Sequence, residues 1–118
     1  MEKPITVLAA GQEPAREAVR EALEGLPLRI LQAASWRAAL RAARAEKPDA
    51  IFLDLDLAGG RAIRRFGRIP VIALGPDAPA NPAARRGFRD RVAPPFRPAD
   101  LARSLARCLA PAPARETA

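Results

Sequence analysis

Short apolar runs alternate with amphipathic helical segments along most of the chain, and this alternation constrains the fold more than any other feature. The run 50–53 has no polar alternation, which is typical of a strand buried on both faces of a sheet. The segment 14–26 instead places apolar residues on one helical face and charged residues on the other. Strands separated by helices predict βαβ units with right-handed crossovers, and therefore a parallel sheet.

Five strands and five helical segments are expected. The strands are predicted at residues 5–9, 28–33, 50–53, 69–74 and 91–93. The helices are predicted from Pro14, from Ser35, over 61–66, around 83–87 and from Pro98. The third is short, and the fourth is irregular because 75–82 is rich in proline. The predicted fold is α/β: a doubly wound, five-stranded parallel sheet of flavodoxin-like order 2-1-3-4-5.

The length of 118 residues suits a single domain, predicted over residues 1–110, with 111–118 as a flexible tail or linker stub. No apolar run approaches the roughly 20 residues that a membrane helix needs. The single Cys108 excludes an internal disulfide, and the lack of histidine excludes Ser-His and Cys-His catalysis within the chain. We therefore expect a cytoplasmic protein that contacts no membrane, is not an enzyme and needs no cofactor.

Positive charge gathers in the second half of the chain. The net charge is +7, yet residues 61–118 alone carry 12 basic and 4 acidic side chains. Arginine suits bidentate pairing with carboxylates, so an acidic protein partner is expected for this half. The predicted partner-binding residues are Arg85, Arg86, Arg89, Arg91, Arg97, Arg103 and Arg107. Specific nucleic-acid binding is not expected, since no nucleic-acid-binding motif is present.

The segment 49–57, Asp-Ala-Ile-Phe-Leu-Asp-Leu-Asp-Leu, resembles the third strand and phosphoacceptor loop of bacterial response regulator receiver domains. Residues 69–74 are similar to the fourth strand of that family, and 87–101 to its fifth strand, Lys-Pro-Phe turn and last helix. The resemblance implies that Asp54 occupies the position of the phosphorylated aspartate. It also implies a two-component signalling role, and a cis peptide bond between Pro94 and Pro95.

The residues that support phosphorylation in the family are replaced here. The acidic pair that holds Mg²⁺ falls on Gly11 and Gln12, the hydroxyl residue on Gly75, and the lysine on Pro94. The switch aromatic of the fifth strand falls on Arg91. Removing one preorganised electrostatic contact costs about 10² to 10³ in rate, so these losses together predict an inactive phosphoacceptor.

Three functional hypotheses follow. The first is a phosphorylation-independent pseudo-receiver that binds a protein partner in bacterial signalling. The second is an atypical response regulator phosphorylated on Asp54, with Mg²⁺ held by Asp54, Asp56 and Glu13. The third is a basic module that binds anions or nucleic acid with steep salt dependence. A homodimer through the arginine-rich region is an open alternative.

Overall fold

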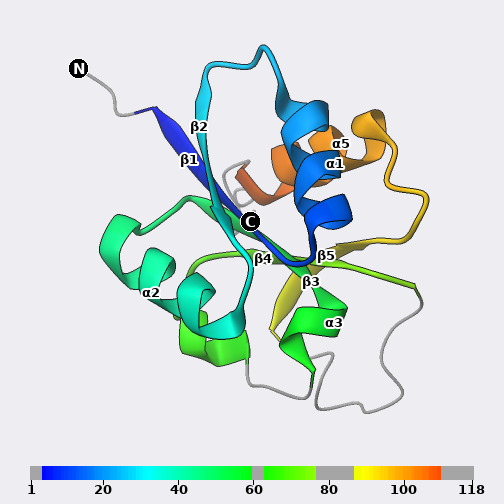
Figure 1. The fold of residues 1–118 in the computed structure, drawn as a ribbon. Helices are drawn as coiled ribbons and strands as arrows, with labels where there is room; N and C mark the ends of the chain where they lie inside the picture. The colour runs from blue at the N-terminus through cyan, green and yellow to red at the C-terminus, as the bar shows by residue number, and fades with distance from the viewer. Residues whose placement is uncertain (1–3, 60–62, 77–86, 110–118) are drawn as a thin grey trace, which may run out of the picture.

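The computed structural model describes residues 4–59, 63–76 and 87–109, and it contains a five-stranded parallel sheet (Figure 1). The strand order is β2-β1-β3-β4-β5. The strands are β1 (Ile5–Ala10), β2 (Leu28–Ala33), β3 (Ala50–Asp54), β4 (Val71–Leu74) and β5 (Phe88–Val92). The predicted α/β class and flavodoxin-like strand order are confirmed.

β3 lies at the centre of the sheet, between β1 and β4, and all of its residues are buried. Phe52 pairs in register with Ala9 on β1 and with Ile72 on β4, and its side chain is fully buried. This strand has no polar alternation because both faces of the sheet are covered by helices.

The helices are α1 (Glu13–Leu23), α2 (Trp36–Glu46), α3 (Leu55–Ala58), the 3-10 helix η1 (Ile63–Phe66) and α5 (Pro98–Leu109). α1 and α5 pack together on one face of the sheet, where their apolar sides enclose Phe52 and Ile72 (Figure 1). α2 and η1 cover the opposite face, around Ile51 and Leu53. The fold therefore has three layers and a hydrophobic core on each side of the sheet.

Local sequence signals explain where the helices begin and end. Pro14 lies in the first turn of α1, where its missing N–H leaves no hydrogen bond unmade. The Ser35 hydroxyl caps α2 by accepting a hydrogen bond from the Ala38 N–H at 3.1 Å. Lys47 ends α2 in the left-handed conformation, with φ 45°.

Two elements differ from the prediction. The short helical stretch expected over 61–66 is present in its described part as the 3-10 helix η1, and a helix that was not expected, α3, begins directly after Asp54. The Asp54 carboxylate caps α3, and this local hydrogen bond starts a helix that hydrophobic spacing does not reveal. β5 begins at Phe88 rather than at residue 91, because Phe88 pairs with Val71 at the start of β4.

Other predictions have different outcomes. The peptide bond between Pro94 and Pro95 is cis, as expected. The helical structure between β3 and β4 is short, as expected, because α3 and η1 have four residues each. The expected fourth helix lies almost wholly outside the described residues, as does the tail at 111–118. Among residues 4–59, 63–76 and 87–109, none of the helices has the length and hydropathy that a bilayer crossing requires.

Candidate functional site

The candidate site lies at the carboxyl edge of the sheet, where the loops after β1, β3 and β4 meet. Asp54 ends β3, Gly11 and Gln12 follow β1, and Gly75 follows β4. Gly75 donates its N–H to the Val92 carbonyl oxygen at 3.1 Å, which ties the loop after β4 to β5. Ligands of doubly wound sheets bind at this edge, so the side chains found here decide what chemistry the domain can perform.

The carboxylate of Asp54 is held by backbone amides. Its Oδ1 accepts a hydrogen bond from the Asp56 N–H at 2.9 Å, and its Oδ2 accepts one from the Gln12 N–H at 3.3 Å. The residue is only 9% exposed. Both oxygens of Asp54 therefore have partners in the protein, and the side chain joins the end of β3 to the loop after β1 and to α3.

Replacing Asp54 with alanine should lower the free energy of unfolding by about 0.5–2 kcal/mol, because the N-cap of α3 is lost. Asp54→Asn keeps an oxygen that can accept the Asp56 N–H, so it should destabilise less. Urea unfolding followed by the fluorescence of the single tryptophan measures both variants. Equal stability of Asp54→Ala and the wild type would contradict a structural role for this carboxylate.

Glycine allows close packing at the two positions that the resemblance assigns to an acidic residue and to a hydroxyl residue. A Cβ atom at Gly11 would lie 2.4 Å from the Cβ of Asp54. A Cβ atom at Gly75 would lie 2.8 Å from Cδ1 of Leu55. Neither a carboxylate nor a hydroxyl side chain fits at these positions unless Asp54 or Leu55 moves.

The structure does not gather Glu13, Asp54 and Asp56 into a three-carboxylate metal site. Glu13 is exposed at the start of α1 and Asp56 is exposed in α3, whereas Asp54 is buried. Within the described parts of the chain, no group of three or more His, Cys, Asp or Glu residues is placed to hold a metal ion. Binding of Mg²⁺ by Asp54, Asp56 and Glu13 stays a prediction.

Comparison with known proteins finds no matching family model and no matching curated protein. Solved structures do match. The receiver domain of a sensor histidine kinase from Pseudomonas aeruginosa, with a magnesium ion coordinated in its active-site cleft, is 28% identical to this chain. The match has a TM-score of 0.72 and covers 91% of this chain and 98% of that one.

The receiver domain of NtrX from Brucella abortus is 26% identical, with a TM-score of 0.74 over 87% of this chain and 97% of that one. The chain folds as a response regulator receiver domain. The chemotaxis response regulator CheY4 of Vibrio cholerae, at 22% identity, shares this receiver fold with a TM-score of 0.72 over 91% of this chain and 100% of that one.

The receiver fold brings five of the seven predicted partner-binding arginines to β5, α5 and the loop between them. Those five are exposed: Arg89, Arg91, Arg97, Arg103 and Arg107. Arg85 and Arg86 lie outside the described residues. The described part of the predicted surface therefore lies on β5, α5 and the loop between them, and its role in binding a partner stays a prediction.

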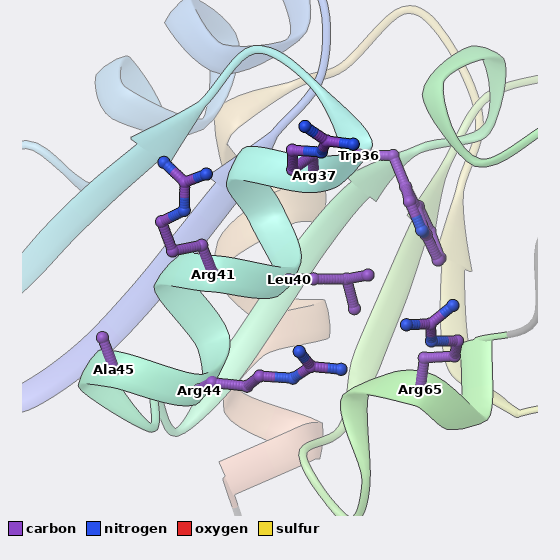
Figure 2. Close-up of a pocket in the computed structure, with 7 residues that line it drawn as sticks. All are labelled: Trp36, Arg37, Leu40, Arg41, Arg44, Ala45 and Arg65. Carbon is purple, nitrogen blue, oxygen red and sulfur yellow. The ribbon is translucent and has the colours of Figure 1, made fainter.

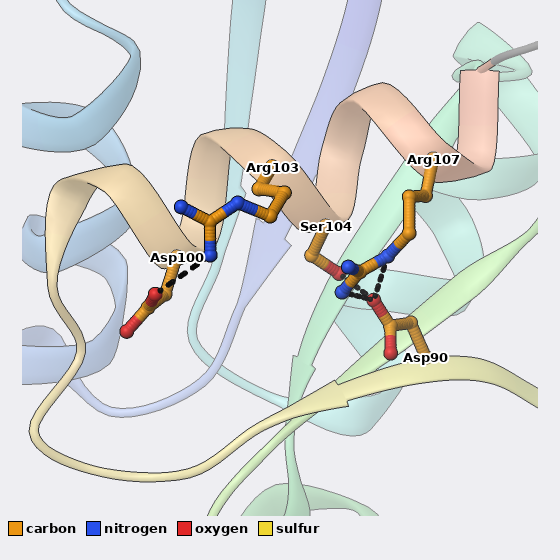
Figure 3. A network of polar contacts seen from close by, with 5 residues as sticks. All are labelled: Asp90, Asp100, Arg103, Ser104 and Arg107. Atoms are coloured by element: carbon orange, nitrogen blue, oxygen red, sulfur yellow. Dashed lines mark hydrogen bonds and ion pairs between the residues drawn. The ribbon is translucent and has the colours of Figure 1, made fainter.

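Carboxylates partly neutralise this surface (Figure 3). Arg107 forms an ion pair with Asp90 at 2.7 Å, and Arg103 forms one with Asp100 at 3.4 Å. Ser104 donates a hydrogen bond to the same Asp90 oxygen at 2.6 Å. Each of these two arginines therefore has its positive charge balanced locally by a carboxylate.

These contacts change the pKa of the Asp90 carboxyl. Partial burial pushes the pKa of Asp90 up, but hydrogen bonds from Ser104 and Arg107 outweigh that effect and leave its pKa below the usual value. The interaction with Asp90 also raises the pKa of Arg107. Asp90 therefore stays ionised in the folded protein at pH values where it is partly protonated in the unfolded chain.

This pairing predicts a loss of stability in acid. A carboxyl whose folded pKa is lowered contributes stability above its unfolded pKa of about 3.9, and loses it as the pH falls through the folded value. We expect Asp90→Asn to show a shallower fall in unfolding free energy than the wild type below about pH 5. Urea unfolding at several pH values between neutral and strongly acidic measures the difference. Parallel pH profiles would contradict this assignment.

Sequence reasoning missed a second basic surface, which lies on the side of the sheet that α2 and η1 cover. Arg37, Arg41 and Arg44 of α2 border a groove with Arg65 of η1 (Figure 2). The spacing of the three α2 arginines is visible in the sequence and could have identified them. The addition of Arg65 required the tertiary structure, because it lies on a separate element.

Proposed function

We propose that this receiver-fold domain binds a protein partner in bacterial signal transduction and works without phosphorylation of Asp54. The amide-held Asp54 carboxylate is the observation that supports the proposal most directly. The neighbouring positions are occupied by Gly11, Gln12 and Gly75, whereas phosphorylation in receiver domains needs acidic and hydroxyl side chains at these positions. Phosphoryl transfer depends on metal ions and cationic groups that neutralise the developing charge. The proposal includes a cytoplasmic setting and no catalytic activity.

The proposed partner surface is formed by β5, α5 and the loop between them. Arg89, Arg91 and Arg97 are exposed there, and no carboxylate among the described residues forms an ion pair with them. Exposed guanidinium groups that form no ion pair with a described carboxylate favour a partner with an acidic face. We include Arg85 and Arg86 in this proposed surface only because they precede β5 in the sequence.

The proposal predicts the result of a titration with Mg²⁺ and beryllofluoride, which mimics the phosphoryl group. In isotope-labelled protein, the amide signals of Glu13, Asp54 and Asp56 should show no saturable shift at millimolar Mg²⁺. A receiver domain that keeps the acidic pair and the lysine provides the positive control in the same buffer. Saturable shifts that spread from Asp54 to the arginines of β5 would overturn the proposal and favour a phosphorylation switch.

A second candidate is an atypical response regulator phosphorylated on Asp54 with a non-standard Mg²⁺ site. The position of Asp54 at the carboxyl end of β3 favours it, as does the magnesium ion in the cleft of the Pseudomonas receiver domain. This candidate predicts that a small-molecule phosphodonor adds one phosphoryl group, detected by intact-protein mass, and that Asp54→Asn abolishes the addition. An unchanged mass would remove this candidate.

A further inference from the structure

A groove of about 690 Å³ lies between α2 and η1, on the face of the sheet opposite α1 and α5. Trp36, Leu40 and Arg44 point from α2 toward η1, where Arg65 faces them (Figure 2). Arg37 and Arg41 extend the basic border along the exposed side of α2. The groove therefore combines an apolar floor with four guanidinium groups.

The positive charge of this groove is not compensated by the described part of the protein. Among the described residues, the groove lining contains no carboxylate, and none of its four described arginines forms an ion pair with a described acidic residue. Glu46, at the end of α2, is paired with Arg29 on β2 at 3.1 Å. The β5 and α5 surface differs, because carboxylates there pair with two of its arginines. The groove is thus suited to an anionic partner.

The apolar floor is fixed in place by packing. The rings of Trp36 and Phe66 meet edge to face, with centroids 5.2 Å apart and an interplanar angle of 68°. Leu40 is only 8% exposed, and Trp36 is half-buried. A fixed aromatic ring beside a leucine and the aliphatic stems of arginines can receive an apolar side chain at small cost in entropy.

The spacing of the α2 arginines points to a helical partner. Arg37, Arg41 and Arg44 stand at i, i+4 and i+7, which places them on one helical face over about 10 Å. A helix packed along α2 can present carboxylates with the same period. Single-stranded nucleic acids instead stack successive bases on several aromatic rings, whereas the described residues that line the groove include one aromatic side chain, Trp36.

We propose that this groove docks an acidic, amphipathic helix of a partner protein. Carboxylates at i, i+4 and i+7 of that helix pair with Arg37, Arg41 and Arg44, and one apolar side chain lies against Trp36 and Leu40. The surface is separate from the one at β5 and α5, so this proposal goes beyond the proposed function and does not depend on it.

The test uses a synthetic helical peptide with glutamates at i, i+4 and i+7 and a leucine at i+3. Trp36 is the only tryptophan and the chain has no tyrosine, so intrinsic fluorescence reports directly on the groove. We expect a saturable change in Trp36 emission. A peptide of the same composition with scrambled spacing should bind at least about tenfold more weakly.

The double variant Arg41→Glu/Arg44→Glu should weaken peptide binding by about tenfold or more. The matched control, Arg91→Glu/Arg97→Glu, makes the same change in net charge on the other surface and should alter the affinity by about twofold or less. All four side chains are exposed, and circular dichroism checks that each variant remains folded.

Three results would overturn the proposal: no saturable change in Trp36 emission, equal loss of affinity in both double variants, or tighter binding of an oligothymidine than of the peptide. The second would reveal general attraction to net charge, and the third would assign the groove to nucleic acid. The Mg²⁺ titration of the Asp54 region is a separate measurement, so failure here is distinguishable from failure of the proposed function.

Discussion

Phe52→Ala is expected to lower the free energy of unfolding by about 3–5 kcal/mol, the largest effect predicted for this protein. Phe52 is fully buried at the middle of the central strand, between Ala9 on β1 and Ile72 on β4. Strands on both sides hold the surrounding backbone in place, so the cavity cannot collapse easily. Domains of this size are stable by about 5–15 kcal/mol, so this variant should unfold at far lower urea concentrations.

A matched control for Phe52 is available on the edge strand. Phe88→Ala removes the same side chain from β5, where the residue is only partly buried and has a strand neighbour on one side. We expect Phe88→Ala to cost clearly less free energy than Phe52→Ala in the same urea titration. Equal losses of unfolding free energy would contradict our interpretation that a cavity in the central strand β3 costs more than one in the edge strand β5.

Gly11→Asp is expected to destabilise the domain by about 1–3 kcal/mol and to give no Mg²⁺ binding, although it restores an acidic residue that receivers use. The reason is steric, because the new Cβ would lie 2.4 Å from the Cβ of Asp54 and 3.0 Å from its Oδ2. Any shift that relieves this overlap also disturbs the hydrogen bonds that hold the Asp54 carboxylate.

The control for Gly11→Asp is Gln12→Asp, which adds the same side chain at the next position. Gln12 is exposed, so an aspartate has room there, and the change in unfolding free energy should stay near 0.5 kcal/mol or less. Urea unfolding gives the stability of both variants, and calorimetric titration gives their Mg²⁺ affinity. A stable Gly11→Asp protein that binds Mg²⁺ would show that the receiver metal site is recoverable, contrary to our interpretation.

The two basic surfaces are built on different elements and differ in how their charge is balanced. Asp90 and Asp100 pair with arginines at β5 and α5, whereas no described carboxylate pairs with the arginines of the α2 groove. The arginines of both surfaces are exposed and do not belong to the hydrophobic core. Reversing the charge of one surface at a time should therefore show which surface binds a given partner, without unfolding the domain.

The sequence alone predicted the alternation of strands and helices and the position of Asp54 at the end of the third strand, because these depend on local patterns. The strand order followed from the general rules for doubly wound sheets. The unbroken apolar run of β3 marks a strand covered on both faces, and the helical spacing of α1, α2 and α5 identifies the elements that cover it. The resemblance to receiver domains also predicts, from the order of segments, that Gly11, Gln12 and Gly75 stand where receivers carry acidic and hydroxyl residues.

The set of residues that meet at each candidate site is known only from the tertiary structure. The contact of Gly11 with Asp54 joins residues 43 positions apart, and the α2 groove needs Arg65 from another element. The start of α3 likewise depends on a carboxylate whose second oxygen is bound by Gln12 of a different loop. Hydrophobic periodicity records which face of an element is buried, but not which side chains from distant segments meet, because that is fixed by how the elements pack.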